Sequence, residues 1–119
     1  MGVENDPLLL LAAQNYKVPG ATTEEFLKDL ARVGVVSRTI SKYSNGHQTN
    51  VRLLLNNIVM LSNSFGAHAT VELLMRKVPA ENHGILFPLM VYLGYMTDEQ
   101  LTDHQVQFDM DTIKLLREL

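Results

Sequence analysis

The sequence contains no cysteine and no tryptophan. The absence of cysteine excludes disulfide bonds, thiolate metal sites and cysteine nucleophiles, so packing alone must hold the fold together. A large charge of one sign is also lacking, because 10 basic and 13 acidic residues give a formal net charge of −3. The whole protein therefore has no field that would draw it to a phosphate backbone, and nucleic-acid binding would need a local basic patch.

Long hydrophobic runs are missing as well. The apolar stretch at residues 84–96 is shorter than the ~20 residues that cross a bilayer, and it contains Pro88 and Gly94. The apolar run at residues 8–13 follows no basic leader and precedes no clear cleavage site, so we expect no signal peptide. The sequence predicts a soluble protein without membrane contacts.

What the sequence does contain fits one globular domain spanning residues 1–119. Of the 119 residues, 46% are hydrophobic and 19% are charged, a balance that favours folding over disorder. A chain of this length should bury roughly two thirds of its unfolded surface in a single core.

Helical periodicity, capping residues and glycine or proline stops follow one another along the chain. They predict helices over residues 7–16, 22–45, 50–65, 67–78, 81–96 (kinked or divided at Pro88), 98–103 and from Asp109 or Asp111 onward. Only residues 33–36 are a weak strand candidate. We therefore predict an all-α fold: a compact orthogonal bundle of about six helices around a central apolar helix at about residues 50–65.

This predicted central helix carries three asparagines. One narrow polar stripe, expected to meet water, is formed by Arg52, Asn56 and Asn63. Asn57 falls instead between Leu53 and Leu61 on the helical wheel. Because an unsatisfied buried amide costs about 1–3 kcal/mol, its carboxamide must find partners inside the fold or at an interface. Asn57 is thus the candidate buried polar residue.

Motifs for catalysis, metal binding and phosphate binding are not found. The four histidines lie in separate segments without metal-ligand spacing, and no glycine-rich phosphate loop or serine elbow occurs. The acidic residues near the C-terminal end suit helix starts better than a metal site. We predict no catalytic residue, no metal and no cofactor, and we expect that the protein is not an enzyme.

Basic residues offer one candidate site for phosphates. Arg32, Arg38 and Lys42 fall near one side of the second predicted helix, with Tyr43 beside them. Three charges at helical spacing are more often a solvated face, so nucleic-acid binding ranks third among our hypotheses.

Apolar residues are in excess between residues 51 and 96, where charges are few. A domain of this size has limited interior, so we expect part of this surface to be exposed and to bind another protein or a second copy of the chain. The candidate interaction surface consists of Leu53, Met60, Leu86, Met90 and Tyr95.

Four segments of the sequence carry a resemblance. They are AAQNYKVPGATTEEFLKDLARV, NVRLLLNNIVMLSNSFGAHATVELLMRKVP, LFPLMVYLGYM and DMDTIKLLREL. Together they resemble a family of short, uncharacterised proteins from tailed bacteriophages, in particular marine phages with large contractile-tail genomes. In that family the second helix is more basic and aromatic than residues 32–42 are here. The resemblance implies a viral origin and a role in infection, and no particular chemistry.

The function that we predict combines the apolar surface with this resemblance. We expect a non-enzymatic small phage protein that acts by protein–protein interaction, as an accessory factor docking on a phage or host replication or transcription machine in the host cytoplasm. The alternatives are a structural subunit of the virion and a nucleic-acid-binding protein that uses the second helix.

Overall fold

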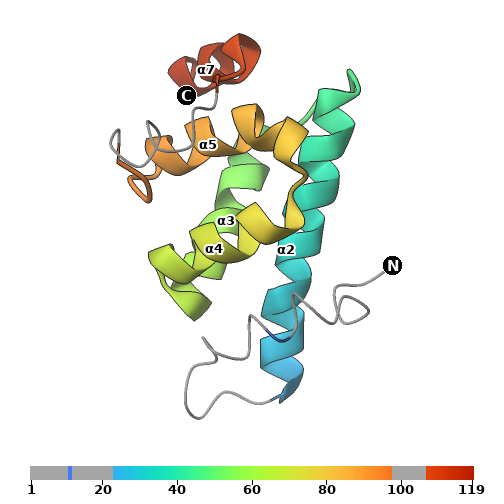
Figure 1. The fold of residues 1–119 in the computed structure, drawn as a ribbon, viewed down its shortest axis with the longest axis vertical. Coiled ribbons are helices and arrows are strands. Elements are labelled where there is room, and N and C mark those ends of the chain that lie inside the picture. The colour runs from blue at the N-terminus through green and yellow to red at the C-terminus, as the bar shows by residue number, and fades with distance from the viewer. Residues whose placement is uncertain (1–10, 12–22, 98–106) are drawn as a thin grey trace.

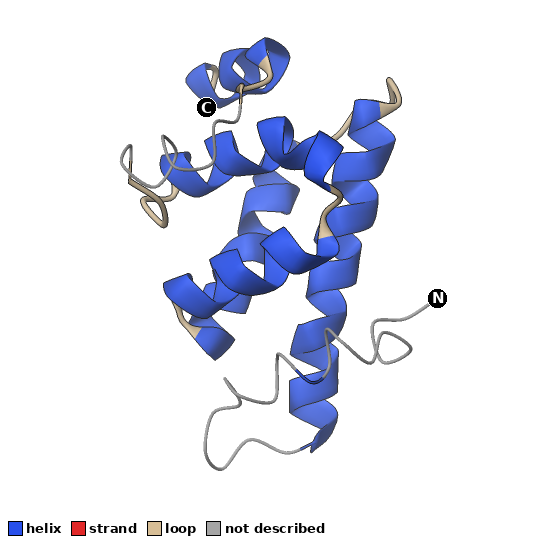
Figure 2. Ribbon diagram, in the orientation of Figure 1, coloured by secondary structure: helices blue, strands red, loops and turns tan. Residues whose placement is uncertain are grey.

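The computed structural model describes residue 11 and residues 23–97 and 107–119. Within these ranges the chain is all-α and contains no β-strand, as the sequence predicts (Figure 1, Figure 2). The elements are α2 (Thr23–Ser44), α3 (Val51–Phe65), α4 (Ala67–Lys77), the 3₁₀-helix η2 (Ala80–Asn82), α5 (His83–Tyr92) and α7 (Met110–Arg117). The helices predicted over residues 7–16 and 98–103 lie outside the described residues, apart from Leu11.

The helix ends follow the capping and turn signals of the sequence. A turn with Gly46 at φ 94° ends α2, and the Asn50 side chain caps α3 by accepting a hydrogen bond from the Leu53 N–H at 3.1 Å. Gly66, at φ 87°, separates α3 from α4, and such a backbone favours glycine over residues with a Cβ. Short connections of this kind bring consecutive helices into contact.

The long helix α2 passes through the weak strand candidate without a break. Val33, Val36 and Ile40 recur at spacings of three and four residues, and each is fully buried. Their common face packs against α3 and α4, which run beside α2 in Figure 1. Burial of this helical stripe therefore outweighs the strand preference of the β-branched residues.

Helix α3 buries one side only. Its buried residues form a single stripe of Val51, Leu54, Leu55, Ile58 and Leu61. On the other side, Leu53 is 59% exposed and Met60 is 44% exposed. The sequence predicts a central apolar helix, but α3 packs mainly against α2 and α4 and leaves Leu53 and Met60 exposed, so its central position is not confirmed.

The most enclosed segment is α5, in which the six consecutive residues 85–90 are all buried. Phe87, Leu86 and Met90 are fully buried. In Figure 1, α5 crosses the end of α2 instead of running along it, and α7 packs against α5. None of the described helices combines the length and hydropathy that a bilayer span requires.

Pro88 lies within α5 and does not divide it. The break that the sequence allows at Pro88 does not occur, because Phe87 is helical and α5 continues from His83 to Tyr92. A change of helix type comes earlier, at η2. Proline removes one helical hydrogen bond, and the carbonyl that loses this donor is that of Gly84. The backbone N–H of Asp109 supplies the donor that Pro88 lacks.

The C-terminal segment is tied to α5 at this carbonyl. The Asp109 N–H donates a hydrogen bond to the Gly84 oxygen at 2.8 Å. A Cβ on Gly84 would lie 2.6 Å from the Gln107 carbonyl oxygen, so the close approach requires glycine. The Asp109 carboxylate then caps α7 by accepting hydrogen bonds from the Thr112 N–H at 2.9 Å and hydroxyl at 2.7 Å. Of the two predicted caps, Asp109 and Asp111, the structure uses the first.

Candidate functional site

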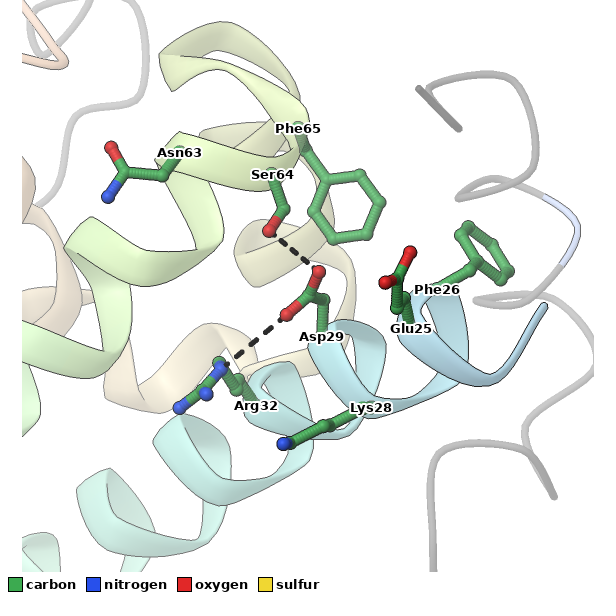
Figure 3. A pocket seen from close by; sticks show the side chains of 8 residues that line it. All are labelled: Glu25, Phe26, Lys28, Asp29, Arg32, Asn63, Ser64 and Phe65. Carbon is green, nitrogen blue, oxygen red and sulfur yellow. Dashed lines mark hydrogen bonds and ion pairs between the residues drawn. The ribbon is translucent and has the colours of Figure 1, made fainter. Parts of the chain in front are cut away.

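A polar cleft of about 400 Å³ lies between the first half of α2 and the end of α3 (Figure 3). Two aromatic rings, Phe26 from α2 and Phe65 from α3, meet edge to face in its wall with centroids 6.0 Å apart. The polar side chains that line the cleft are Glu25, Lys28, Asp29, Arg32, Asn63 and Ser64. Charged groups from one long helix thus face hydroxyl and amide groups from the other.

A chain of polar contacts crosses this cleft from α3 to α2 and back. The Ser64 hydroxyl donates to Asp29 Oδ2 at 2.7 Å, and Asp29 Oδ1 lies 3.8 Å from Arg32 Nε (Figure 3). Arg32 Nη1 then donates to Asn57 Oδ1 on α3 at 3.2 Å. These contacts lie at the edge of the apolar α2–α3 interface, where they fix the register of the two helices.

Asn57 is half-buried, and both ends of its carboxamide have partners within the fold. Its oxygen accepts the hydrogen bond from Arg32, and its nitrogen donates to the Leu53 carbonyl at 3.1 Å. The neighbouring polar stripe, by contrast, is exposed along its whole length at Arg52, Asn56 and Asn63. Asn57 thus serves the helix–helix contact, whereas the other two asparagines face solvent.

Replacing Asn57 by leucine should destabilise the protein by about 1–2 kcal/mol. The change removes the acceptor of a hydrogen bond from a cation whose side chain is only 22% exposed. Arg32 Nε is buried without a hydrogen-bond acceptor, so the ion pair with Asp29 at 3.8 Å would be the remaining contact of the guanidinium described here. Chemical denaturation followed by circular dichroism would measure the change.

The matched control is Asn56→Leu, which places the same side chain at the adjacent exposed position and should alter stability by less than about 0.5 kcal/mol. An Arg32→Ala, Asn57→Leu double mutant should show coupling of about 1 kcal/mol. Equal, additive effects of the two asparagine replacements would contradict this role of Asn57.

The three basic residues predicted as phosphate contacts do not form one group. Arg32 is half-buried and directed at α3, whereas Arg38 and Lys42 are exposed. Arg38 lies six residues further along α2, which rotates it ~120° away from Arg32 around the helix. The predicted grouping is therefore wrong for Arg32, whose guanidinium is engaged by Asp29 and Asn57.

Among the described residues that line the cleft, Ser64 donates to a carboxylate, and there is no histidine to accept its proton. In the described ranges no three histidine or acidic side chains gather as metal ligands would. The contacts across the cleft explain how α2 and α3 are held together.

The exposed side of α3 forms a second candidate site. We define the α3 face as Leu53, Asn56 and Met60, which recur at helical spacing on the solvent side. A hollow of about 250 Å³ adjoins it, lined by Arg52, Leu55, Asn56, Tyr92 and Leu119. Tyr92 is 51% exposed, so an aromatic ring from α5 extends the apolar surface of α3.

Two of the five predicted surface residues do not reach the surface. Leu86 and Met90 are fully buried in α5, so they cannot contact a partner and this part of the prediction is wrong. The reason is that they belong to the run of residues 85–90 in α5, all of which are buried, whereas the exposed Tyr92 lies at the end of the helix. Tyr95 is half-buried, and its hydroxyl donates to Ser62 Oγ at 2.6 Å.

The groove between α5 and α7 was not predicted from the sequence. It is lined by Val91 and Tyr92 on α5 and by Phe108, Ile113 and Leu116 near and on α7. The sequence signal for this surface was the set of apolar residues at 108, 113 and 116, whose spacing indicates a last helix. That spacing does not show that the helix would leave its contact with α5 partly open, because the opening depends on how the two helices pack.

The described residues form a small all-α fold in which polar contacts join α2 and α3 and apolar residues are exposed on α3 and beside α7. The chain belongs to a family of unknown function (DUF7207), whose model matches residues 1–119. No curated protein and no solved structure matches the chain. The phage origin implied by the resemblance stays a prediction.

Proposed function

We propose that the protein is a non-enzymatic binding protein that recognises another protein through the α3 face. The observation that carries this proposal is the exposure of two large apolar side chains, Leu53 at 59% and Met60 at 44%, on a helix whose other side is buried. Large apolar side chains that emerge together beside an aromatic residue are typical of protein-binding surfaces.

The composition of the surface supports the same function. Methionine and tyrosine are enriched in interfaces, and Met60 and Tyr92 supply both types here. Arg52 and Asn63 are exposed at the border, as expected for the polar rim around an apolar centre. Arg52 also lines the hollow that adjoins Tyr92, where it would contact the same partner.

The cellular setting of this proposal rests on the resemblance to phage proteins. We place the protein in the host cytoplasm during infection, as an accessory factor that docks on a phage or host replication or transcription protein. A structural role in the virion is the alternative, and detection of the protein in purified particles would favour it. The engagement of Arg32 with Asn57 argues against the third hypothesis, nucleic-acid binding through α2.

Charge on the α3 face should abolish binding of the partner. In the variant Leu53→Glu, Met60→Glu, two exposed anchors become carboxylates that a partner would have to desolvate, so affinity should fall by about a hundredfold or more. The measurement is co-purification of the tagged protein from infected cells, followed by titration of the partner identified by mass spectrometry.

The control is Met110→Glu, because Met110 is 68% exposed on α7 and outside the α3 face. This variant should retain the partner, and all three proteins should show the same circular dichroism spectrum. A partner that binds the double variant as tightly as the parent would refute the proposed use of α3.

A further inference from the structure

A groove of about 360 Å³ runs between α5 and α7. Apart from the guanidinium of Arg117 and the hydroxyl of Tyr92, its lining is apolar. The lining residues are Pro88, Val91, Tyr92, Phe108, Ile113, Leu116 and Arg117. Phe108, Ile113 and Val91 are only half-buried, so apolar surface stays accessible on both walls.

The groove exists because α7 meets α5 over a limited area. Helix α7 has eight residues, of which Thr112 and Leu116 are buried. Its start is fixed to α5 by the hydrogen bond from the Asp109 N–H to the Gly84 carbonyl. Beyond this anchor the two helices leave an apolar furrow whose outer edge is Tyr92.

In the part of the chain that the structure describes, the charged residue that lines the groove is Arg117. Asp111 lines a different hollow with Tyr43 and His47. Glu118 lines a third hollow, beside Thr49 and Arg52. The depression that shares Tyr92 with the groove contains a second cation, Arg52, which also lines the hollow of Glu118. A chain with a net charge of −3 thus presents the Arg117 guanidinium beside an otherwise apolar described lining.

We infer that this groove binds an amphipathic helix of the partner protein, with an apolar side chain against Val91, Phe108 and Ile113 and an aspartate or glutamate paired with Arg117. The charge complementarity favours an acidic flank on the occupant, since the described lining offers the Arg117 guanidinium as a partner. We assign a helix because an amphipathic helix binds by placing its apolar face in an apolar groove, and α5 and α7 form such a groove here. This inference rests on the proposed function, and it specifies that the partner's binding segment is an amphipathic helix with an acidic residue.

Continuity with the α3 face supports the assignment. Tyr92 lines both the groove and the hollow beside Asn56, so one partner could cover both surfaces without a gap. An amphipathic helix lies in a groove through residues spaced i, i+3 or i+4 and i+7, and its acidic side would then face Arg117. The partner's remaining surface would contact Leu53 and Met60.

The test uses the full chain as bait for a displayed library of helical peptides with random surface positions. We expect the selected peptides to share apolar residues at helical spacing and at least one aspartate or glutamate beside them. Amide chemical shifts of the ¹⁵N-labelled protein should move at residues 89–92 and 108–117 when a selected peptide is added.

Two charge reversals on α7 separate the groove from general electrostatics. Arg117→Glu should weaken peptide binding about tenfold, equivalent to about 1.4 kcal/mol, and a peptide with its acidic residue changed to lysine should restore binding. Lys114→Glu makes the same change on an exposed residue outside the groove lining and should leave affinity within about twofold.

Several results would overturn the inference. They are the absence of selected binders, binders without acidic preference, equal effects of the two reversals, and a parent protein that dimerises through the groove in light scattering. Failure of the inference differs from failure of the proposed function. A cellular partner lost with the α3 double variant but retained by Arg117→Glu would reject only the groove, and a partner retained by both would reject the α3 face itself.

Discussion

Replacing Gly84 by alanine should destabilise the protein by about 2 kcal/mol, although alanine is the better helix former. The new Cβ would lie 2.6 Å from the Gln107 carbonyl oxygen, a backbone atom that cannot rotate away. Overpacking costs about 1–3 kcal/mol and loss of the Asp109 hydrogen bond about 1 kcal/mol, against a propensity gain of about 1 kcal/mol. Urea unfolding monitored by circular dichroism measures the difference.

Whether Gly84→Ala lowers or raises the free energy of unfolding decides between close packing at Gly84 and helix propensity alone. Helix propensity alone predicts that Gly84→Ala stabilises the protein, so a gain of about 1 kcal/mol would show that residues 107–109 do not approach Gly84 closely. Gly94→Ala is the matched control. Gly94 has φ 78°, and no atom lies within 4 Å of the position that a Cβ would take. Alanine there should cost about 1–2 kcal/mol through the backbone and leave α7 in place.

Replacing Phe87 by alanine should have the largest effect of any single truncation, a loss of about 4 kcal/mol. Phe87 is the largest fully buried side chain in the described residues, and its ring stacks on that of His83 with centroids 5.1 Å apart. Removal of a buried phenylalanine leaves a cavity and costs about 3–5 kcal/mol. Since domains of this size are stable by about 5–15 kcal/mol, much of the total would be lost.

Tyr92→Ala is the control for this prediction. It removes an aromatic ring from the same helix, but the ring is 51% exposed, so the loss should be about 1 kcal/mol or less. Thermal unfolding should show the Phe87 variant melting far below the Tyr92 variant. Similar melting temperatures would mean that α5 is not the enclosed helix that its burial indicates.

The helices were predictable because their signals are local. Capping residues such as Asn50, glycines at 46 and 66 and the spacing of Val33, Val36 and Ile40 all act within one or two turns of the chain. The helix boundaries that these signals set depend little on the rest of the fold. The all-α class follows from these local signals alone.

The surface was less predictable because exposure depends on tertiary contacts. Leu53 and Leu86 are both leucines in apolar segments, yet one is 59% exposed and the other fully buried. Periodicity distinguishes the buried side of an amphipathic helix from its exposed side. Because α5 is apolar on every side, its sequence does not show which residues are exposed. Likewise, nothing near Arg32 in the sequence indicated that it would donate to Asn57, 25 residues away.

The bond between Asp109 and Gly84 makes one proton a reporter of the whole C-terminal helix. In the described residues it is the backbone hydrogen bond that joins two helical segments far apart in sequence. Any opening that frees α7 must expose this amide to solvent, whereas the amides inside α3 exchange only when that helix itself opens. Its hydrogen-exchange rate therefore gives the free energy of detaching α7, and a partner in the adjoining groove would slow it.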